Sequence, residues 1–152
     1  MKSATASLTD KQQTQEGGYK LPYHWTIDPA TIKGRLYFGY WNAAIAALGL
    51  NGHERPDKRS PRIADAGCGD GRVLALLRDA GYQDLTGIDY SEKALAFTKD
   101  MLPGVKTVLA DLKEITLPDG SFEGIVCIET LEHIPPEELE RVGKYALDIE
   151  TI

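Results

Sequence analysis

Residues 62–71 read Arg-Ile-Ala-Asp-Ala-Gly-Cys-Gly-Asp-Gly, a short and partly apolar run that ends in three closely spaced glycines. The run predicts a β-strand, and Gly67 and Gly69 allow the chain to turn sharply after it and to approach a ligand closely. Gly71 lets a following helix pack near the strand. The amides of such a turn and the start of such a helix favour an anionic group, either an amino-acid carboxylate or a phosphate.

The spacing of the glycines distinguishes this turn from a dinucleotide-binding turn. The dinucleotide pattern G-x-G-x-x-G would place its third glycine at position 72, which is Arg72. The pattern here is G-x-G-x-G, and an acid, Asp65, precedes the first glycine by two positions. A nicotinamide-dependent oxidoreductase is therefore the weaker hypothesis, and a glycine turn without any ligand is a further alternative.

Strand and helix patterns alternate on the C-terminal side of this turn. The predicted strands cover 62–66, 85–88, 105–110 and 122–128, and the predicted helices cover 71–80, 92–102 and a segment that begins at Pro136. Ser91 is the expected cap of the second of these helices. This order predicts an α/β fold with a Rossmann-like parallel sheet, helices on its faces and right-handed crossovers. Ligands of such sheets bind at the carboxyl ends of the strands.

Asp89 stands at one of these strand ends, 22 residues after Gly67. A carboxylate at this place can accept hydrogen bonds from both hydroxyls of a ribose. The alternative is a local cap of the chain near Ser91, because aspartate commonly serves in that way.

The chain divides into three predicted regions: a disordered polar tail over 1–18, an aromatic helical segment and loop over 19–60, and a ligand-binding half domain over 61–152. A helix is expected to begin at Asp28-Pro29 and to end near Leu48. The aromatic run Tyr23-His24-Trp25 is expected to pack on the sheet, with a lid over a substrate as the alternative.

Composition excludes several classes of function. The net charge of −6 lacks the basic footprint of a nucleic-acid-binding protein. No apolar stretch is long enough to predict a membrane span, and the three histidines lack metal-ligand spacing. Cys68 and Cys127 lack CxxC spacing, which favours free thiols in a reducing cytoplasm.

Four stretches over roughly 62–141 resemble, in the family's order, the motifs of class I S-adenosylmethionine-dependent methyltransferases, and more narrowly the "type 11" group that acts on small molecules. These stretches are Asp65-Ala66-Gly67-Cys68-Gly69-Asp70-Gly71, Asp89-Tyr90-Ser91, Ala110-Asp111-Leu112 and the segment 122–134. The last departs from the family pattern at Glu123, where an aspartate is usual, and at Gly124, which weakens the start of a strand.

For the methionine part of S-adenosylmethionine, the resemblance implies a set of contacts at two strand ends. Gly67, Cys68 and Gly69 would present their backbone to it, and Asp65 would help to hold its amino group. Glu129 would end the fourth strand beside the methionine part and the acceptor pocket.

For the adenosine part, the resemblance implies contacts from the two outer strands. Asp89 would bind the ribose hydroxyls, and Tyr90 would lie against the adenine ring. Asp111 would accept from the adenine amino group, with the amide of Leu112 nearby.

His133 is the candidate catalytic base, because the fourth motif of the family often carries a histidine there. Since it stands just before Pro135-Pro136, it is also a candidate for a structural role, fixing the start of the next helix.

Members of the resembled family have seven strands in the order 3-2-1-4-5-7-6, and four are predicted here, in the order 3-2-1-4. A C-terminally incomplete sheet is therefore expected, with a partner chain or a dimer covering the edge of the fourth strand. The expected function is methyl transfer from S-adenosylmethionine to a small-molecule acceptor. The alternative is a truncated or split methyltransferase that is inactive until a partner chain completes it.

Overall fold

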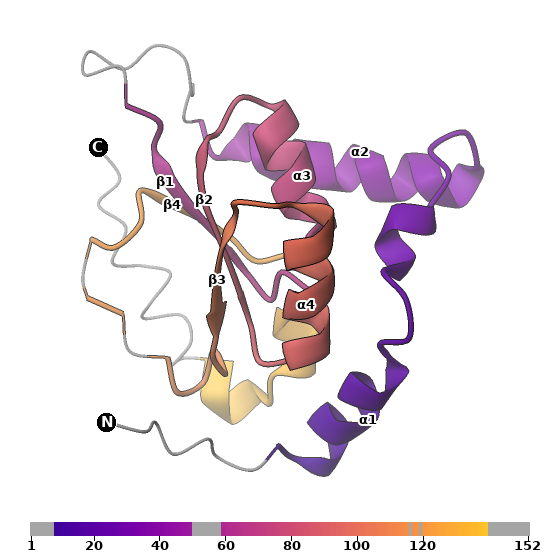
Figure 1. Ribbon diagram of the computed structural model, residues 1–152, viewed down its shortest axis with the longest axis vertical. Helices are drawn as coiled ribbons and strands as arrows, with labels where there is room; N and C mark the ends of the chain where they lie inside the picture. Colours follow the sequence, from indigo (N-terminus) through magenta and orange to yellow (C-terminus); the bar gives the residue numbers. More distant parts are fainter. Residues whose placement is uncertain (1–7, 50–58, 116, 119, 140–152) are drawn as a thin grey trace.

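The computed structural model describes residues 8–49, 59–115, 117–118 and 120–139 (Figure 1). Its centre is a parallel four-stranded sheet in the order β3-β2-β1-β4. The strands are β1 (Arg62–Ala66), β2 (Asp84–Asp89), β3 (Lys106–Leu109) and β4 (Gly124–Val126). The predicted α/β fold, the Rossmann-like sheet and its strand order are confirmed.

The strand β1 lies inside the sheet because it pairs on both sides. Ala64 stands opposite Thr86 of β2 and Ile125 of β4. A strand that is covered on both faces needs an apolar sequence, and Ile63 and Ala64 are fully buried. β4 is shorter than the predicted strand 122–128, because its ladder with β1 includes only three residue pairs.

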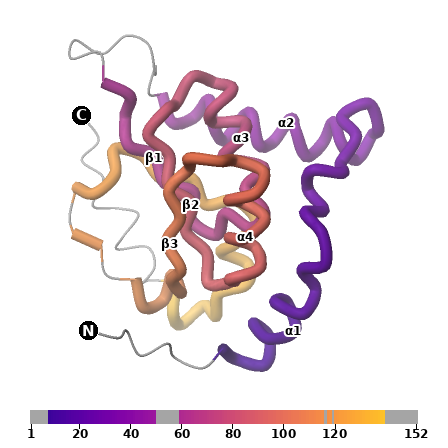
Figure 2. The backbone as a smooth tube through the Cα atoms, viewed as in Figure 1, coloured from indigo at the N-terminus to yellow at the C-terminus, as the bar shows by residue number. Residues whose placement is uncertain are grey.

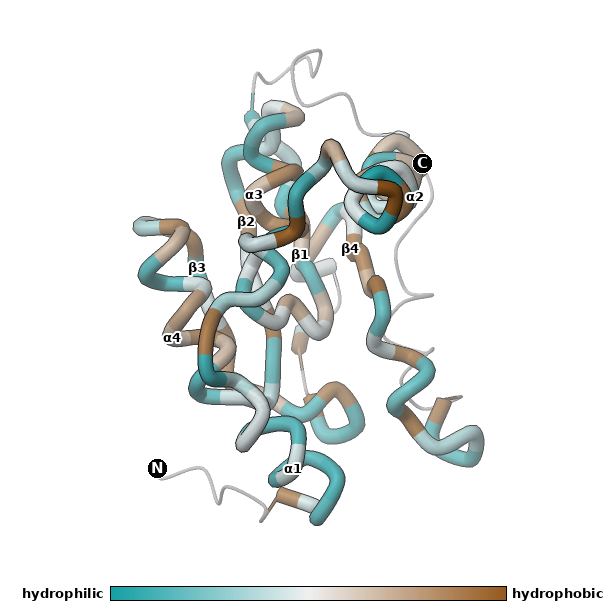
Figure 3. The backbone as a smooth tube through the Cα atoms, turned by 90° about the vertical axis from the view of Figure 1, so that its right-hand side faces the viewer, coloured by the Kyte–Doolittle hydropathy of each residue, from teal (hydrophilic) through white to brown (hydrophobic). Residues whose placement is uncertain are grey.

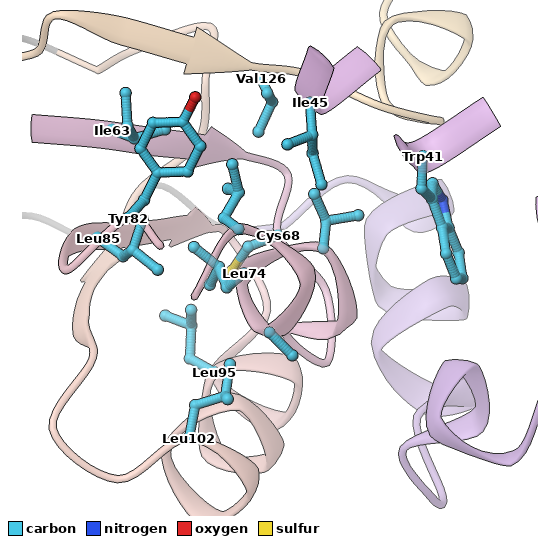
Figure 4. Close-up of a cluster of buried hydrophobic side chains, with 13 residues drawn as sticks. Trp41, Ile45, Ile63, Cys68, Leu74, Tyr82, Leu85, Leu95, Leu102 and Val126 are labelled. Atoms are coloured by element: carbon cyan, nitrogen blue, oxygen red, sulfur yellow. The ribbon is translucent and has the colours of Figure 1, made fainter. Parts of the chain in front are cut away.

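Two apolar clusters occupy the two faces of the sheet. The larger contains Ile63 and Leu85 from the strands together with Leu74 and Leu95 from two helices (Figure 4). The smaller contains Ala64, Ile88 and Ile115. Because neighbouring residues of a strand point to opposite faces, the consecutive residues Ile63 and Ala64 belong to different clusters.

The helices α3 (Arg72–Asp79) and α4 (Glu92–Met101), close to their predicted bounds, both contribute to the larger cluster, as does a helix that comes earlier in the chain. Ser91 caps α4 as predicted, since its Oγ accepts from the amide of Ala94 at 3.0 Å. Gly71, just before α3, has φ +81°, and a Cβ there would lie 2.9 Å from Oγ1 of Thr98 in α4. Glycine is therefore required for the close approach of the two helices.

The N-terminal region differs from its prediction. The helix α1 (Asp10–Gly18) occupies half of the segment 1–18, for which a disordered tail was the expectation, and that expectation is wrong for these residues. Thr9 and Gln12 form a capping box that closes the first turn of α1. Figure 2 shows the indigo segment with α1 running past α4 toward the next helix.

That next helix is α2 (Ile32–Ala47), preceded by the short 3₁₀ helix η1 (Tyr23–Thr26). α2 begins three residues later than expected, because Thr31 is its cap and accepts from the amide of Gly34 at 3.0 Å. Asp28 instead accepts from the amide of Ala30 in a local turn.

The chain after β4 continues through the 3₁₀ helix η2 (Leu131–His133) into a helix that begins at Pro136, as predicted. Residues 50–58 of the predicted loop and 140–152 of the predicted half domain lie outside the described residues. Among the helices that the structure describes, none is long and apolar enough to cross a membrane.

Candidate cofactor site

A cavity of about 480 Å³ lies at the carboxyl ends of the strands, where the fold class predicts a ligand. All of the residues that the sequence analysis assigns to the cofactor or to catalysis line it. These residues are Asp65, Gly67, Cys68, Gly69, Asp89, Tyr90, Asp111, Leu112, Glu129 and His133. The structure therefore brings the four motifs together around one cavity, while the role of each residue stays a prediction.

The amides of the glycine turn are used within the protein. The amides of Gly67 and Cys68 donate to the carbonyl of Ile88 at 2.7 and 3.0 Å. The amide of Gly69 donates to Oδ2 of Asp89 at 2.9 Å. The expectation that the amides of the turn receive an anionic group is therefore wrong for these three residues, although their backbone lines the cavity.

Gly67 is required by a contact that the sequence does not reveal. Its φ is +81°, and a Cβ at this position would lie 2.1 Å from Oγ1 of Thr130. Glu129 just before Thr130 has φ +54°, a left-handed conformation that is uncommon outside glycine. This turn after β4 brings Glu129 and Thr130 against the glycine turn, at the wall of the cavity.

Asp65, the last residue but one of β1, is a buried acid with one unpaired oxygen. Only 2% of its surface is exposed, and its Oδ2 has no hydrogen-bond partner among the described residues. Burial, and then the nearby carboxylate of Asp89, raise its pKa to about 8. A buried carboxylate with an unpaired oxygen is complementary to a cationic group such as an ammonium.

Asp89 forms the local cap that was considered for it, while its binding of a ribose stays a prediction. Its Oδ1 accepts from the amide of Ser91 at 2.8 Å, which is the local cap. Its Oδ2 accepts from Gly69, and the carboxylate lines the cavity. Burial raises the pKa of Asp89, and the hydrogen bonds from Ser91 and Gly69 act in the opposite direction. An ionised carboxylate has about four acceptor positions, so two amides leave room for ribose hydroxyls.

The adenine end of the predicted site contains Tyr90 and Asp111. The buried hydroxyl of Tyr90 has no partner among the described residues, and burial raises its pKa. Oδ1 of Asp111 accepts from the amide of Lys113 at 3.0 Å. Oδ2 of Asp111 accepts from the carboxamide of Gln12 at 2.7 Å. The carboxylate expected to bind adenine is therefore bonded to α1.

The helix α1 forms a wall of the cavity that the sequence analysis missed. Besides Gln12, Lys11 donates to the carbonyl of His133 at 3.3 Å. The carboxylate of Glu16 accepts from the hydroxyl of Ser91 and from the amide of Lys93. None of the residues of α1 is buried, and Figure 3 shows mostly hydrophilic colours along it. Polar bonds to the ends of β3, α4 and η2 therefore hold α1 in place.

The aromatic segment packs on the glycine turn, which corrects the expectation that it packs on the sheet. The fully buried carboxylate of Asp70 accepts from the amide of His24 at 2.9 Å and contacts its ring Nδ1 at 3.0 Å. Nε1 of Trp25 donates to the carbonyl of Asp70 at 2.8 Å. Tyr23 and His24 line the cavity. Asp70, inside the first motif, is thus the anchor of this segment.

Arg72 lines the cavity from the first turn of α3. Its guanidinium lies 5.0 Å from the ring centre of Trp25 and 4.9 Å from that of Phe38. Its Nε is buried and has no hydrogen-bond partner among the described residues. In the sequence, the position of Arg72 excludes the dinucleotide pattern but does not reveal these surroundings.

His133 lines the cavity at the end of η2, and its side chain is exposed. Its amide donates to the carbonyl of Thr130 at 3.0 Å, and its carbonyl accepts from Lys11. These bonds join His133 to the start of η2 and to α1, so its role in fixing the start of the next helix and the catalytic role of its ring both stay predictions. Cys68 and Cys127 are free thiols. The described residues contain no cluster of acids, histidines and cysteines that could hold a metal ion.

Comparisons with known proteins agree with this architecture. A family model described as "Methyltransferase domain" matches residues 63–149, which is more than half of the chain. Among curated proteins, 27-O-demethylrifamycin SV methyltransferase of Amycolatopsis mediterranei is 30% identical over 114 residues, covering 66% of this chain and 42% of that protein. EEF1A lysine methyltransferase 2 of Danio rerio is 36% identical over 90 residues, which cover 55% of this chain and 39% of that protein. The chain spans less than half the length of these relatives.

The solved structure of magnesium protoporphyrin IX methyltransferase from Synechocystis, with bound S-adenosylmethionine, has the same fold. Its TM-score is 0.60 at 20% identity, covering 94% of this chain and 74% of that one. The structure of an S-adenosylmethionine-dependent methyltransferase from Mesorhizobium loti matches with a TM-score of 0.54 and 26% identity. The match covers 68% of this chain and 47% of that one. With the family match, the parallel sheet and its strand order, these findings show that the chain belongs to the class I S-adenosylmethionine-dependent methyltransferases.

Proposed function

We propose that this chain binds S-adenosylmethionine in the cavity at the strand ends and presents it for methyl transfer to a small-molecule acceptor. The observation that carries the proposal is the placement of three acids, Asp65, Asp89 and Asp111. They lie at or just beyond the carboxyl ends of the neighbouring strands β1, β2 and β3, and they line one cavity. The cofactor has three consecutive polar parts: an amino acid, a ribose and an adenine. The three acids lie at three neighbouring strand ends, so each acid can bind one of these parts.

The chemistry of each acid supports its assignment. Asp65, with its unpaired oxygen, suits the ammonium of the methionine part. Asp89 has acceptor positions left for the ribose hydroxyls. Asp111 can accept from the adenine amino group after Gln12 has released Oδ2 or while the two donors share it. Tyr90, whose hydroxyl is buried without a partner, lies between these two acids in the sequence and lines the same cavity.

Methyl transfer needs mainly alignment. The bound cofactor supplies a methyl group on a positively charged sulfur, and the protein must hold the acceptor in line with it. A hydroxyl acceptor also needs a group that takes its proton. We propose His133 for this role. His24 is a second candidate, because the buried Asp70 fixes the orientation of its ring at the cavity wall.

The class of acceptor is part of the proposal. The name of one relative refers to a rifamycin and that of another to a lysine of the protein EEF1A, so family membership does not choose between a metabolite and a protein. The net charge of −6 disfavours a nucleic acid. We therefore propose a small metabolite, a lipid-like molecule or a sugar as the acceptor.

The alternative to a self-sufficient enzyme is a cofactor-binding unit whose transfer reaction needs further protein. One observation favours this alternative: β4 has a partner strand on one side only among the described residues. Cofactor binding is expected in both cases, because the three acids and the glycine turn belong to this chain.

The test is a calorimetric titration of the chain with S-adenosylhomocysteine. We expect saturable binding of one ligand per chain. Asp89→Asn should weaken it about 10- to 100-fold, because charge-assisted hydrogen bonds to the ribose are lost. The control is Asp84→Asn at the opposite end of the same strand, where the acid pairs with the exposed Lys106. Equal affinities of both variants and the wild type would contradict the assignment of Asp89.

A further inference from the structure

Buried polar atoms without a hydrogen-bond partner are concentrated at the cavity. Four such side-chain atoms occur among the described residues, and three of them belong to side chains that line it. These are Oδ2 of Asp65, Nε of Arg72 and the hydroxyl of Tyr90. Folded proteins pair nearly all of their buried polar groups. Unpaired groups around one cavity therefore indicate where a ligand has polar groups of its own.

The amino-acid end of the proposed cofactor carries an ammonium and a carboxylate, and the carboxylate needs a donor. The amides of Gly67, Cys68 and Gly69 cannot supply it, because they already donate to Ile88 and Asp89. The donor must therefore come from a cationic side chain or from elsewhere on the cavity wall.

Three lysine and arginine side chains line the cavity, and two of them are engaged. Lys11 donates to the carbonyl of His133. Lys113 pairs with Asp111 and Glu138. Arg72 makes no hydrogen bond or ion pair to the residues that the structure describes, and its guanidinium lies over the rings of Trp25 and Phe38. Of these three side chains, Arg72 is therefore the one whose donors are not already used by another described residue.

The groups around Arg72 favour the binding of a carboxylate by its guanidinium. The rings of Trp25 and Phe38 contact the guanidinium at 5.0 and 4.9 Å, which restrains its plane. The N–H groups of a guanidinium lie in that plane and form a fork that matches a carboxylate. Arg72 is also the first residue of α3, where the helix dipole adds to the attraction for an anion.

We infer that Arg72 binds the carboxylate of the cofactor's methionine part, so that Arg72 and Asp65 together recognise the amino-acid end of the cofactor as a zwitterion. The two side chains flank the glycine turn, one before it and one after it. This inference rests on the proposed function. It adds a binding residue outside the acids and glycines of the family motifs, and it gives the aromatic segment a second role as the support of Arg72.

The experiment compares S-adenosylmethionine with decarboxylated S-adenosylmethionine, which keeps the ammonium, the sulfonium and the adenosine. We expect the wild type to prefer S-adenosylmethionine about 10- to 100-fold. Arg72→Gln should reduce this preference to near one, and Arg72→Lys, which keeps the charge without the planar fork, should retain part of it. The control is Arg78→Gln in the last turn of the same helix, an exposed position that should keep the wild-type preference.

The outcomes separate the inference from the proposed function. If the wild type binds neither ligand, the proposed function fails. If it binds both ligands equally, or if Arg72→Gln weakens both by the same factor, the inference fails and the proposed function stands. Should Arg72→Gln unfold by circular dichroism, Arg72→Met keeps an unbranched side chain beside the two rings and allows the same comparison.

Discussion

Replacing Asp65 should change how the stability of this fold depends on pH. In the folded chain, burial and the neighbouring Asp89 raise the pKa of Asp65 from its ordinary value near 3.8 to about 8. In the unfolded chain, Asp65 ionises near its ordinary value. Between pH 4 and pH 8 the folded state therefore binds more protons than the unfolded state, and stability falls as the pH rises.

The size of the effect follows from this difference in pKa. Each pH unit between the two values lowers the free energy of unfolding by at most about 1.4 kcal/mol. The full interval would give an upper limit of about 6 kcal/mol. Water entry and relaxation around an ionised carboxylate reduce such effects, so we expect about 1–3 kcal/mol between pH 5 and pH 8.

The assay is urea unfolding of the wild type and of Asp65→Asn at several pH values. Asparagine has nearly the same shape as aspartate and cannot ionise. Burying its amide changes the free energy of unfolding by the same amount at every pH, so it does not alter how that free energy depends on pH. We expect the stability of Asp65→Asn relative to the wild type to increase from pH 5 to pH 8 and to level off above pH 8. Parallel curves for the two proteins would refute the assignment of a raised pKa to Asp65.

Two further substitutions test the walls of the cavity. Gln12→Ala removes the bond between α1 and Asp111, so it should tighten S-adenosylhomocysteine binding about 2- to 10-fold in calorimetry. Gln13→Ala, whose carboxamide bonds to the chain just before α1, is the matched control, and a weaker affinity of Gln12→Ala would show that Gln12 contacts the ligand instead. Gly67→Ala should lower the free energy of unfolding by about 2–4 kcal/mol, because it combines a left-handed backbone with an overlap against Thr130. Thr130→Ala in the same chain should restore part of this loss, and no restoration would contradict the overlap.

Local signals in the sequence were sufficient to predict the sheet and the helices packed on it. The apolar run before Gly67, the cap at Ser91 and the start of the last helix at Pro136 depend on neighbouring residues alone, and each is found where it was expected. The positions of the acids at the strand ends follow from the parallel sheet.

The N-terminal wall of the site could not be predicted in this way. The polar composition of 1–18 favours disorder, and none of the residues of α1 is buried. Contacts of Lys11, Gln12 and Glu16 with segments roughly 75 to 120 positions away hold the helix in place. The capping box at Thr9 was the only local signal for α1, and it does not tell where the helix packs.

The hydrogen-bond partners of the glycine-turn amides could not be predicted from the sequence either. The pattern of glycines predicts a tight turn that lines a site, which the structure has. Whether the amides of the turn face a ligand or the protein depends on the carbonyl of Ile88 and the carboxylate of Asp89, which belong to another strand. The same fact leaves Arg72 as the candidate partner of an anion.

The central claim is that one cavity at the strand ends holds the whole cofactor. Its most direct test is a titration of the isotope-labelled chain with S-adenosylhomocysteine, followed by the NMR signals of its backbone amides. We predict saturable shifts of the amides in 65–72, 89–91 and 111–113, with smaller ones in α1, and unchanged signals in the first two turns of α2. Shifts confined to other parts of the chain, or no shifts at millimolar ligand, would contradict the claim.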